Sequence, residues 1–228
     1  MAVAFGHSST GAASSATSLS FSHTATGDNL LVAVISARLV TGGCSTSDIT
    51  NLAITYNSVS LSFNKGSTSG GVNASTGTCV FGYVMSLANP ATGANTLSAT
   101  WTGSAYVTIS CMSFSGADGG IGTIVEQLTA SGTTFTASQT ITANDMLMGG
   151  VAIADLTTAF SMLNSNGIKV GDGGANTASG AETNTGSGSV TVNGSCSASQ
   201  GKAFWAIPII ATGAAATTNN LSTLNVGT

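Results

Sequence analysis

The chain has 228 residues, enough for one sizeable β domain or two small ones, and only 5% of them are charged. Its formal net charge is −4, and the four basic residues are scattered, at Arg38, Lys65, Lys169 and Lys202. No basic stripe could therefore neutralise the phosphates of a nucleic acid, and no apolar run approaches the roughly 18–20 residues of a membrane span. An uncharged composition suits a protein that packs against copies of itself or works outside the cell.

Short apolar runs bounded by Gly, Asn and Ser recur along the chain, which is typical of an all-β protein. The sequence predicts strands near residues 2–5, 17–24, 29–37, 49–56, 59–63, 78–87, 95–102, 105–115, 121–128, 133–141, 145–154, 188–193 and 202–211. Asn57-Ser58 predicts a hairpin turn, since Asn tolerates a positive φ. No segment shows the apolar stripe and caps of a helix, so we expect little helix.

Two segments repeat one pattern 116 positions apart, because residues 17–36 (TSLSFSHTATGDNLLVAVIS) align without a gap with residues 133–152 (TTFTASQTITANDMLMGGVA). The C-terminal segments of the two halves are also similar in sequence pattern. Aligning Leu97 with Val190 and Gly116 with Gly213 places about four extra residues in the second half's turn. This repeat predicts that each half supplies part of two facing sheets.

The predicted fold is therefore an all-β, jelly-roll-like antiparallel β-sandwich over residues 17–213, built from the pseudo-repeated halves 17–116 and 117–213. Two small independent sandwiches are the alternative. Residues 1–16 and 214–228 are small and polar, and they are expected to form an N-terminal arm and a C-terminal tail that reach neighbouring subunits. Residues 171–189 are expected to form a long glycine-rich loop.

No catalytic motif is present, and His7 and His23 are the only histidines that could serve a Ser–His–acid triad. His23 aligns with Gln139 of the second half, and exposed polar positions explain both histidines. We therefore expect no enzymatic activity, no catalytic residue and no cofactor.

A calcium site is the only metal site that the sequence suggests. Asp172, Asn176, Glu182 and Asn184 could offer oxygen ligands, but their spacing matches no standard calcium loop, and a flexible polar loop is the simpler interpretation. Asp28 and Asn144 are expected to form turns before equivalent strands. The remaining acids considered, Asp118, Glu126, Asp145 and Asp155, are dispersed. We therefore expect no metal site.

Trp101 and Trp205 lie in the predicted closing hairpins of the two halves, where packing at related sites is the simpler role and an aromatic platform for a sugar the alternative. Tyr56, Tyr83 and Tyr106 have the same expectation. Among the cysteines, Cys111 lies in an apolar run and is expected to be buried. A disulfide between Cys44 and Cys79 is left open, with free thiols as the default.

The stretches SFSHTATGDNLLVAVISA, ITYNSVSLSF and VFGYVMSLANPATGANTLSATWTGSAYVTISCMSFSGAD resemble a diffuse family of β-sandwich domains. These domains occur in bacterial secreted proteins and in tailed-phage structural proteins. The resemblance covers roughly residues 17–213, rests on turns and apolar runs, and carries no functional residue. It implies a structural or adhesive role.

Without a recognisable signal peptide, the phage side of that family is favoured. We expect a non-enzymatic virion protein of the decoration (cement) type, made in the host cytoplasm and placed on a phage capsid surface. Its expected partners are copies of itself and a major capsid protein, without nucleic acid or membrane. The alternatives are an extracellular self-assembling filament subunit, or a module that binds a surface glycan through a tryptophan or residues 171–189.

Overall fold

The computed structural model describes residues 1–39, 49–66, 72–73, 79–129, 132–153, 160–162, 167–171, 177–196 and 201–211. Every regular element in these residues is a β-strand with antiparallel partners, so the predicted all-β antiparallel fold is confirmed. The same residues contain no helix of the length and apolarity that a membrane crossing requires.

The first half forms one eight-stranded sheet. Its strands are β1 (Ala4–Ala25), β2 (Leu30–Leu39), β3 (Thr50–Tyr56), β4 (Val59–Ser60), β5 (Ser62–Gly66), β6 (Val72–Asn73), β7 (Cys79–Ala88) and β8 (Gly93–Ser115). They run in the order β4-β3-β8-β2-β7-β5, with β1 paired to β8 and β6 paired to β7. The predicted hairpin turn is confirmed, since Asn57 and Ser58 join β3 to β4 with φ of 49° and 66°.

The long strands β1 and β8 both bend, and this bend folds the sheet over on itself. Ser15 and Gly103 have φ of 51° and 87°, and the register of the pair shifts between Ala13 and Ser18. Residues 18–25 and 93–102 therefore join β3 in an outer layer. Residues 4–13 and 105–115 join β2 and β7 in an inner layer.

The second half forms two sheets. Its strands are β9 (Ala117–Ile121), β10 (Val125–Thr129), β11 (Thr134–Ile141), β12 (Met146–Ile153), β13 (Phe160–Met162), β14 (Ile168–Gly171), β15 (Ala178–Thr185), β16 (Gly188–Cys196) and β17 (Lys202–Ala211). The inner sheet has the order β10-β17-β12-β15-β14, with β9 beside β17, and the outer sheet has the order β11-β16-β13.

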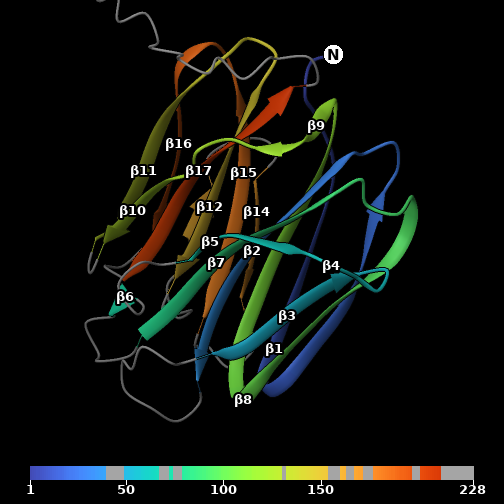
Figure 1. Ribbon diagram of the computed structural model, residues 1–228. Helices are drawn as coiled ribbons and strands as arrows, with labels where there is room; N and C mark the ends of the chain where they lie inside the picture. The colour runs from blue at the N-terminus through green and yellow to red at the C-terminus, as the bar shows by residue number, and fades with distance from the viewer. Residues whose placement is uncertain are drawn as a thin grey trace, which may run out of the picture.

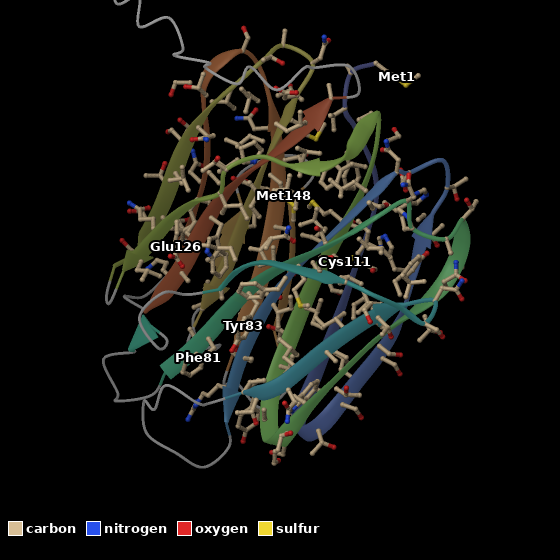
Figure 2. The ribbon with its side chains drawn as sticks, in the orientation of Figure 1. Met1, Phe81, Tyr83, Cys111, Glu126 and Met148 are labelled. Carbon is tan, nitrogen blue, oxygen red and sulfur yellow. The ribbon has the colours of Figure 1, made fainter. Side chains whose placement is uncertain are left out.

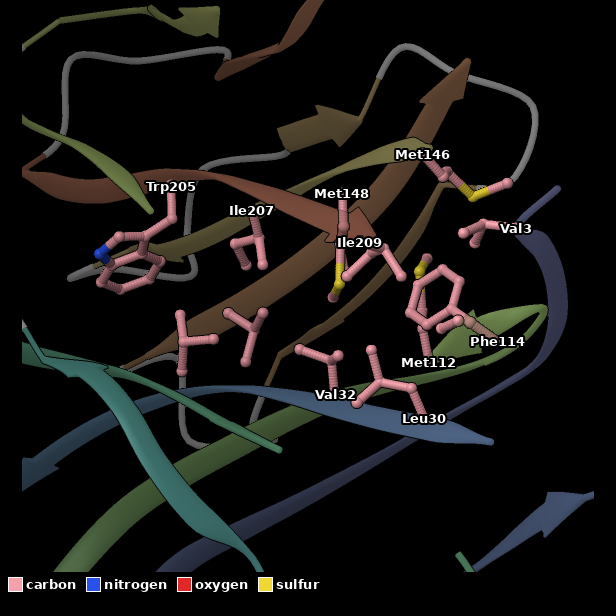
Figure 3. Packing of buried hydrophobic residues seen from close by; sticks show 14 of the residues in the cluster. Val3, Leu30, Val32, Met112, Phe114, Met146, Met148, Trp205, Ile207 and Ile209 are labelled. Atoms are coloured by element: carbon pink, nitrogen blue, oxygen red, sulfur yellow. The ribbon is translucent and has the colours of Figure 1, made fainter. Parts of the chain in front are cut away.

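The four layers stack, with the two inner layers in the middle. In Figure 1, β11 and β16 lie at the upper left and β3 and β4 at the lower right, with β12, β17, β2 and β7 between them. Three apolar cores fill the spaces between consecutive layers. Figure 3 shows the middle core, in which Met148 and Ile207 of the second half face Val32 and Leu30 of the first.

The strand ladders confirm that the chain is built from two repeated halves. In the first half β2 lies between β8 and β7, and in the second β12 lies between β17 and β15. The outer layers correspond as well, since β1 and β3 flank β8 just as β11 and β13 flank β16. Each half is thus a small sandwich of the same topology.

Two details of the sequence alignment were wrong. Leu19 pairs with Ala99 and the equivalent Phe135 pairs with Gly194. Leu30 pairs with Phe114, and the equivalent Met146 pairs with Ile209. In both comparisons the partner residue in the second half lies 95 positions after its counterpart in the first. The closing strands therefore keep one offset, and the second half's turn has no extra residues. The second error concerns the sheets. We predicted that each half supplies part of two shared sheets, but each sheet takes its strands from one half only.

The expected N-terminal arm is also corrected. Residues 4–16 are the first stretch of β1 and pair with β8 of the same chain. Their Gly, Ser and Ala side chains give no apolar alternation, so the sequence could not show that their backbone hydrogen bonds are made within the fold. The expected C-terminal tail, residues 214–228, lies outside the described residues.

Candidate functional site

The two outer layers expose surfaces built from hydroxyl side chains. On the first half this surface, the first hydroxyl face, consists of Ser18, Ser20, Ser22, Thr55, Thr96, Ser98 and Thr100. On the second half, the second hydroxyl face consists of Thr134, Thr136, Ser138, Thr140, Ser189, Thr191, Asn193 and Ser195. In both, the residues between them along each strand point into the apolar core, as period-two alternation requires.

The two faces are equivalent under the repeat and lie at opposite ends of the stack. Ser22 pairs with Thr96 across strands, and the equivalent Ser138 pairs with Thr191. The Ser138 and Thr191 hydroxyls are hydrogen-bonded at 2.7 Å. Cross-strand pairs of this kind stabilise a sheet by roughly 0.2–1 kcal/mol each.

Ionic groups are almost absent from the exposed surface of the described residues. Asp145, Glu182 and Lys202 are buried, and the side chain of Asp28 is 1% exposed. Glu126 forms an ion pair with Lys65, with 3.5 Å between Oε2 and Nζ. Every Asp, Glu, Lys and Arg whose side chain is described is at least partly buried, whereas the His7 side chain is 42% exposed. The acids and bases among the described side chains therefore present little charge to other molecules.

The first hydroxyl face contains a pocket of about 340 Å³. It lies between the hairpin turn after β3 and the outer stretches of β1 and β8. Its lining consists of Ser22, Thr55, Asn57, Ser58, Ala94, Asn95, Thr96 and Ser98. The pocket offers hydroxyl and amide groups and no ionic group, which suits neutral polar ligands.

The two histidines lie near one carboxylate but do not form a triad. Asp28 Oδ2 accepts a hydrogen bond from Ser113 Oγ at 2.6 Å and lies 3.2 Å from His7 Nδ1. His23 Nδ1 is hydrogen-bonded to Ser9 Oγ at 2.8 Å. The serine and His7 thus meet on the carboxylate, whereas a triad places the histidine between serine and acid.

The expectation that His23 is exposed was wrong. Its side chain is 1% exposed, packs edge-on against the Tyr56 ring, and leaves the buried Nε2 without a hydrogen-bond partner. Burial, assisted by the nearby charge of His7 and opposed by that of Asp28, lowers the pKa of His23 to about 4. His23 is therefore neutral at neutral pH.

Two of the four residues considered for calcium lie on a strand. Glu182 and Asn184 lie on β15, which pairs with β12 and β14, so residues 178–185 are a strand where the sequence predicted a loop. Glu182 Oε1 accepts a hydrogen bond from the Asn193 backbone, and Asn184 Nδ2 donates to the Thr191 carbonyl oxygen. Asp172 and Asn176 lie outside the described residues. No cluster suited to a metal ion occurs in the described part of the chain.

The dispersed acids play separate roles where the structure describes them. Asp145 Oδ1 accepts a hydrogen bond from the Ala211 backbone and its Oδ2 accepts two from Thr142, so it closes the turn before β12. Glu126 Oε1 accepts a hydrogen bond from Trp205 Nε1. Asp28, expected to form a turn, does so by accepting from the Thr26 backbone, while Asn144 lies in the turn before β12. The Asp118 side chain and Asp155 are not described.

The tryptophans are packing residues, so a sugar platform built on them is contradicted. Trp101 is 6% exposed and donates to the Ala16 carbonyl oxygen, and Trp205 is fully buried. They are not at related sites, because the ladders make Ser110 the equivalent of Trp205. Tyr56 is likewise buried, while Tyr83 and Tyr106 are half-buried.

Cys111 is fully buried, as predicted, and it lies well inside the molecule in Figure 2, whereas Met1 lies at the edge. Cys111 and Cys196 are free thiols. The disulfide between Cys44 and Cys79 that the sequence left open is not tested, because neither side chain is among those described.

No protein-family model, curated protein or solved structure was found to match this chain.

Proposed function

We propose that this chain is a non-enzymatic structural protein that decorates and stabilises a phage capsid on the virion surface by bridging neighbouring subunits. One observation carries the proposal: each Asp, Glu, Lys and Arg whose side chain is described is at least partly buried, and the two ends of the molecule are hydroxyl faces without a charged side chain. Exposed charge keeps soluble proteins apart, so a surface with few exposed charged side chains favours association.

The faces can form close contacts at low cost. An interface of Ser and Thr side chains does not require ions to be removed from water, which costs several kcal/mol for each ion. Hydroxyl groups both donate and accept hydrogen bonds, so such a face can pair with the backbone or side chains of a partner.

The placement of the faces suits a bridging role. Because they lie at opposite ends of one stack, a single molecule can contact two neighbours at once. Many such contacts, repeated by the symmetry of a shell, add up through multivalency. The partners would be copies of this chain and a major capsid protein, and the resemblance to phage structural proteins supports this choice. An extracellular filament built from this chain alone is the second candidate, because two equivalent faces could also join like molecules end to end.

Cryo-electron microscopy of the particles that carry this chain tests the proposal. We expect density for the four-layer stack on the outer shell of a capsid, with at least one hydroxyl face against a neighbour. A continuous helical array of this chain alone would replace the capsid with a filament. A monodisperse monomer that is absent from any particle would overturn both.

Single lysines placed on the faces test the mechanism. Ser20→Lys and Thr136→Lys add a charge to the first and second face, and Ala143→Lys adds the same charge at the exposed turn between β11 and β12. At least one face variant is expected to lower particle binding more than tenfold, because a buried unpaired ammonium costs several kcal/mol. Equal binding by all three variants would contradict contact through the faces.

A further inference from the structure

We infer that the pocket on the first hydroxyl face binds a neutral, hydroxyl-rich ligand, namely a hexose unit of a surface glycan. Five hydroxyl side chains line it: Ser22, Thr55, Ser58, Thr96 and Ser98. Its volume of about 340 Å³ falls at the lower end of the roughly 300–1,000 Å³ typical of small-molecule sites. This inference is independent of the capsid proposal.

The chemistry of the lining selects the ligand class. A charged ligand would find no counter-ion among the lining residues, and an apolar ligand would leave the hydroxyl groups unpaired, which costs roughly 1–3 kcal/mol for each buried group. A sugar ring presents hydroxyl groups that donate and accept, and each can pair with a Ser or Thr hydroxyl, which does the same.

The hydroxyl groups of the pocket are available to a ligand. Within the described residues, the structure shows no side-chain hydrogen bond made by Ser22, Thr55, Ser58, Thr96 or Ser98. At the equivalent place on the second half, the Ser138 and Thr191 hydroxyls bond to each other at 2.7 Å. The hydroxyl groups at this pair of positions therefore bond to each other on the second face and are available to a ligand on the first.

The walls of the pocket are held in place from beneath by Tyr56, which is fully buried. Its phenol oxygen lies 3.0 Å from the Gly93 carbonyl oxygen and 3.2 Å from the Ala91 carbonyl oxygen, within hydrogen-bond distance of both. The Asn57 backbone N–H donates to the Thr96 carbonyl oxygen at 3.0 Å. These contacts tie the hairpin turn to β8, so little ordering is required when a ligand binds, which favours affinity.

Titration of the labelled full chain, followed by backbone amide NMR shifts, tests the inference. The probes are methyl glycosides of glucose, galactose and mannose, with glucuronic acid and sialic acid as charged comparisons. We expect saturable shifts at Asn57, Ser58 and Thr96 with at least one neutral sugar. The dissociation constant should be on the order of 1 mM, as for one small polar ligand in an open site.

Thr96→Val removes one pocket hydroxyl and keeps the β-branched shape, and Thr191→Val makes the same change on the second face. Thr96→Val should weaken sugar binding more than fivefold while Thr191→Val leaves it unchanged. Matching melting temperatures would show that both variants fold. The absence of saturable shifts up to about 50 mM neutral sugar, equal loss in both variants, or tighter binding of the acidic sugars would each overturn the inference. Thr136→Lys, which tests the capsid proposal, should leave sugar binding intact, so the two proposals can fail separately.

Discussion

Val34 of β2 and Gly150 of β12 meet at the centre of the molecule, and they occupy equivalent positions in the two halves. A Cβ atom added at Gly150 would lie 2.7 Å from Val34 Cγ2. Equivalent residues can touch each other only near the axis that relates the two halves. The inner sheets therefore pack as a twofold homodimer interface does, although both belong to one chain.

Gly150→Ala should destabilise the protein by about 1–3 kcal/mol, the cost of inserting an extra methyl group into a filled core. In the double variant with Val34→Ala, the removed methyl groups make room for the new one. Urea unfolding of the single and double variants should therefore give a double-variant loss smaller than the sum of the single losses. Strict additivity would contradict the contact.

The same local symmetry relates Gly82 and Trp205 to Ser179 and Ser110. A Cβ at Gly82 would lie 2.2 Å from Trp205 Cη2, whereas the Ser179 and Ser110 hydroxyls are hydrogen-bonded at 3.1 Å. On one side of the axis the large Trp205 side chain therefore packs against Gly82, and on the other side two small residues, Ser110 and Ser179, take the equivalent positions. Gly82→Ala should cost about 1–3 kcal/mol.

Ser179→Ala is the matched change at the equivalent position. It creates no overlap, but it removes the hydrogen-bond partner of the buried Ser110 hydroxyl, so its expected cost is about 1–3 kcal/mol. Thermal unfolding and tryptophan fluorescence measure both variants, and a shifted emission of Trp205 is expected only for Gly82→Ala. An equal shift of the Trp205 emission in Ser179→Ala and in Gly82→Ala would contradict the packing described.

His23 should make the stability depend on pH. Burial, with the charge of His7, lowers its folded-state pKa from 6.5 to about 4, so the unfolded chain takes up the proton first as the pH falls. The stabilisation from neutral His23 is complete above pH 6.5 and is lost as the pH falls from 6.5 to 4, by about 2–3 kcal/mol.

Urea unfolding at intervals between pH 7 and pH 4.5 measures this loss. His23→Gln introduces the residue found at the equivalent position, Gln139, and should flatten the profile in this window. A variant that keeps the slope of the original protein would assign the titration to another group.

The buried thiols should be unreactive in the folded protein. Burial raises the pKa of Cys111 and that of Cys196, the latter partly opposed by the charge of Lys202, so little thiolate forms at pH 8. A Cys44→Ser/Cys79→Ser variant keeps Cys111 and Cys196 as its only thiols. Ellman's reagent should label neither thiol until denaturant is added, and then both. Fast labelling of the native variant would show that the core opens.

The position of the candidate pocket could not have been predicted from its residues. Ser22, Thr55 and Thr96 look like any other exposed strand residues, and they meet only because the bend at Gly103 places β8 between β1 and β3. The burial of His23 was equally hidden, since a lone histidine in a polar stretch gives no sign of the Ser9 hydroxyl or the Tyr56 ring beside it.

The amino-acid pattern by itself determined the strand content, the Asn57-Ser58 turn and the two repeated halves, because alternation, apolar runs and turn residues are local properties. The unbroken apolar runs of β2 and β12 also require cover on both faces, which the four-layer stack provides. Only the tertiary structure decided that each half closes its own sheets, that residues 4–16 and 178–185 are strands, and that the acids and Lys/Arg side chains it describes are at least partly buried. Small side chains leave no local pattern, so the position of those strands depends on backbone pairing with distant partners.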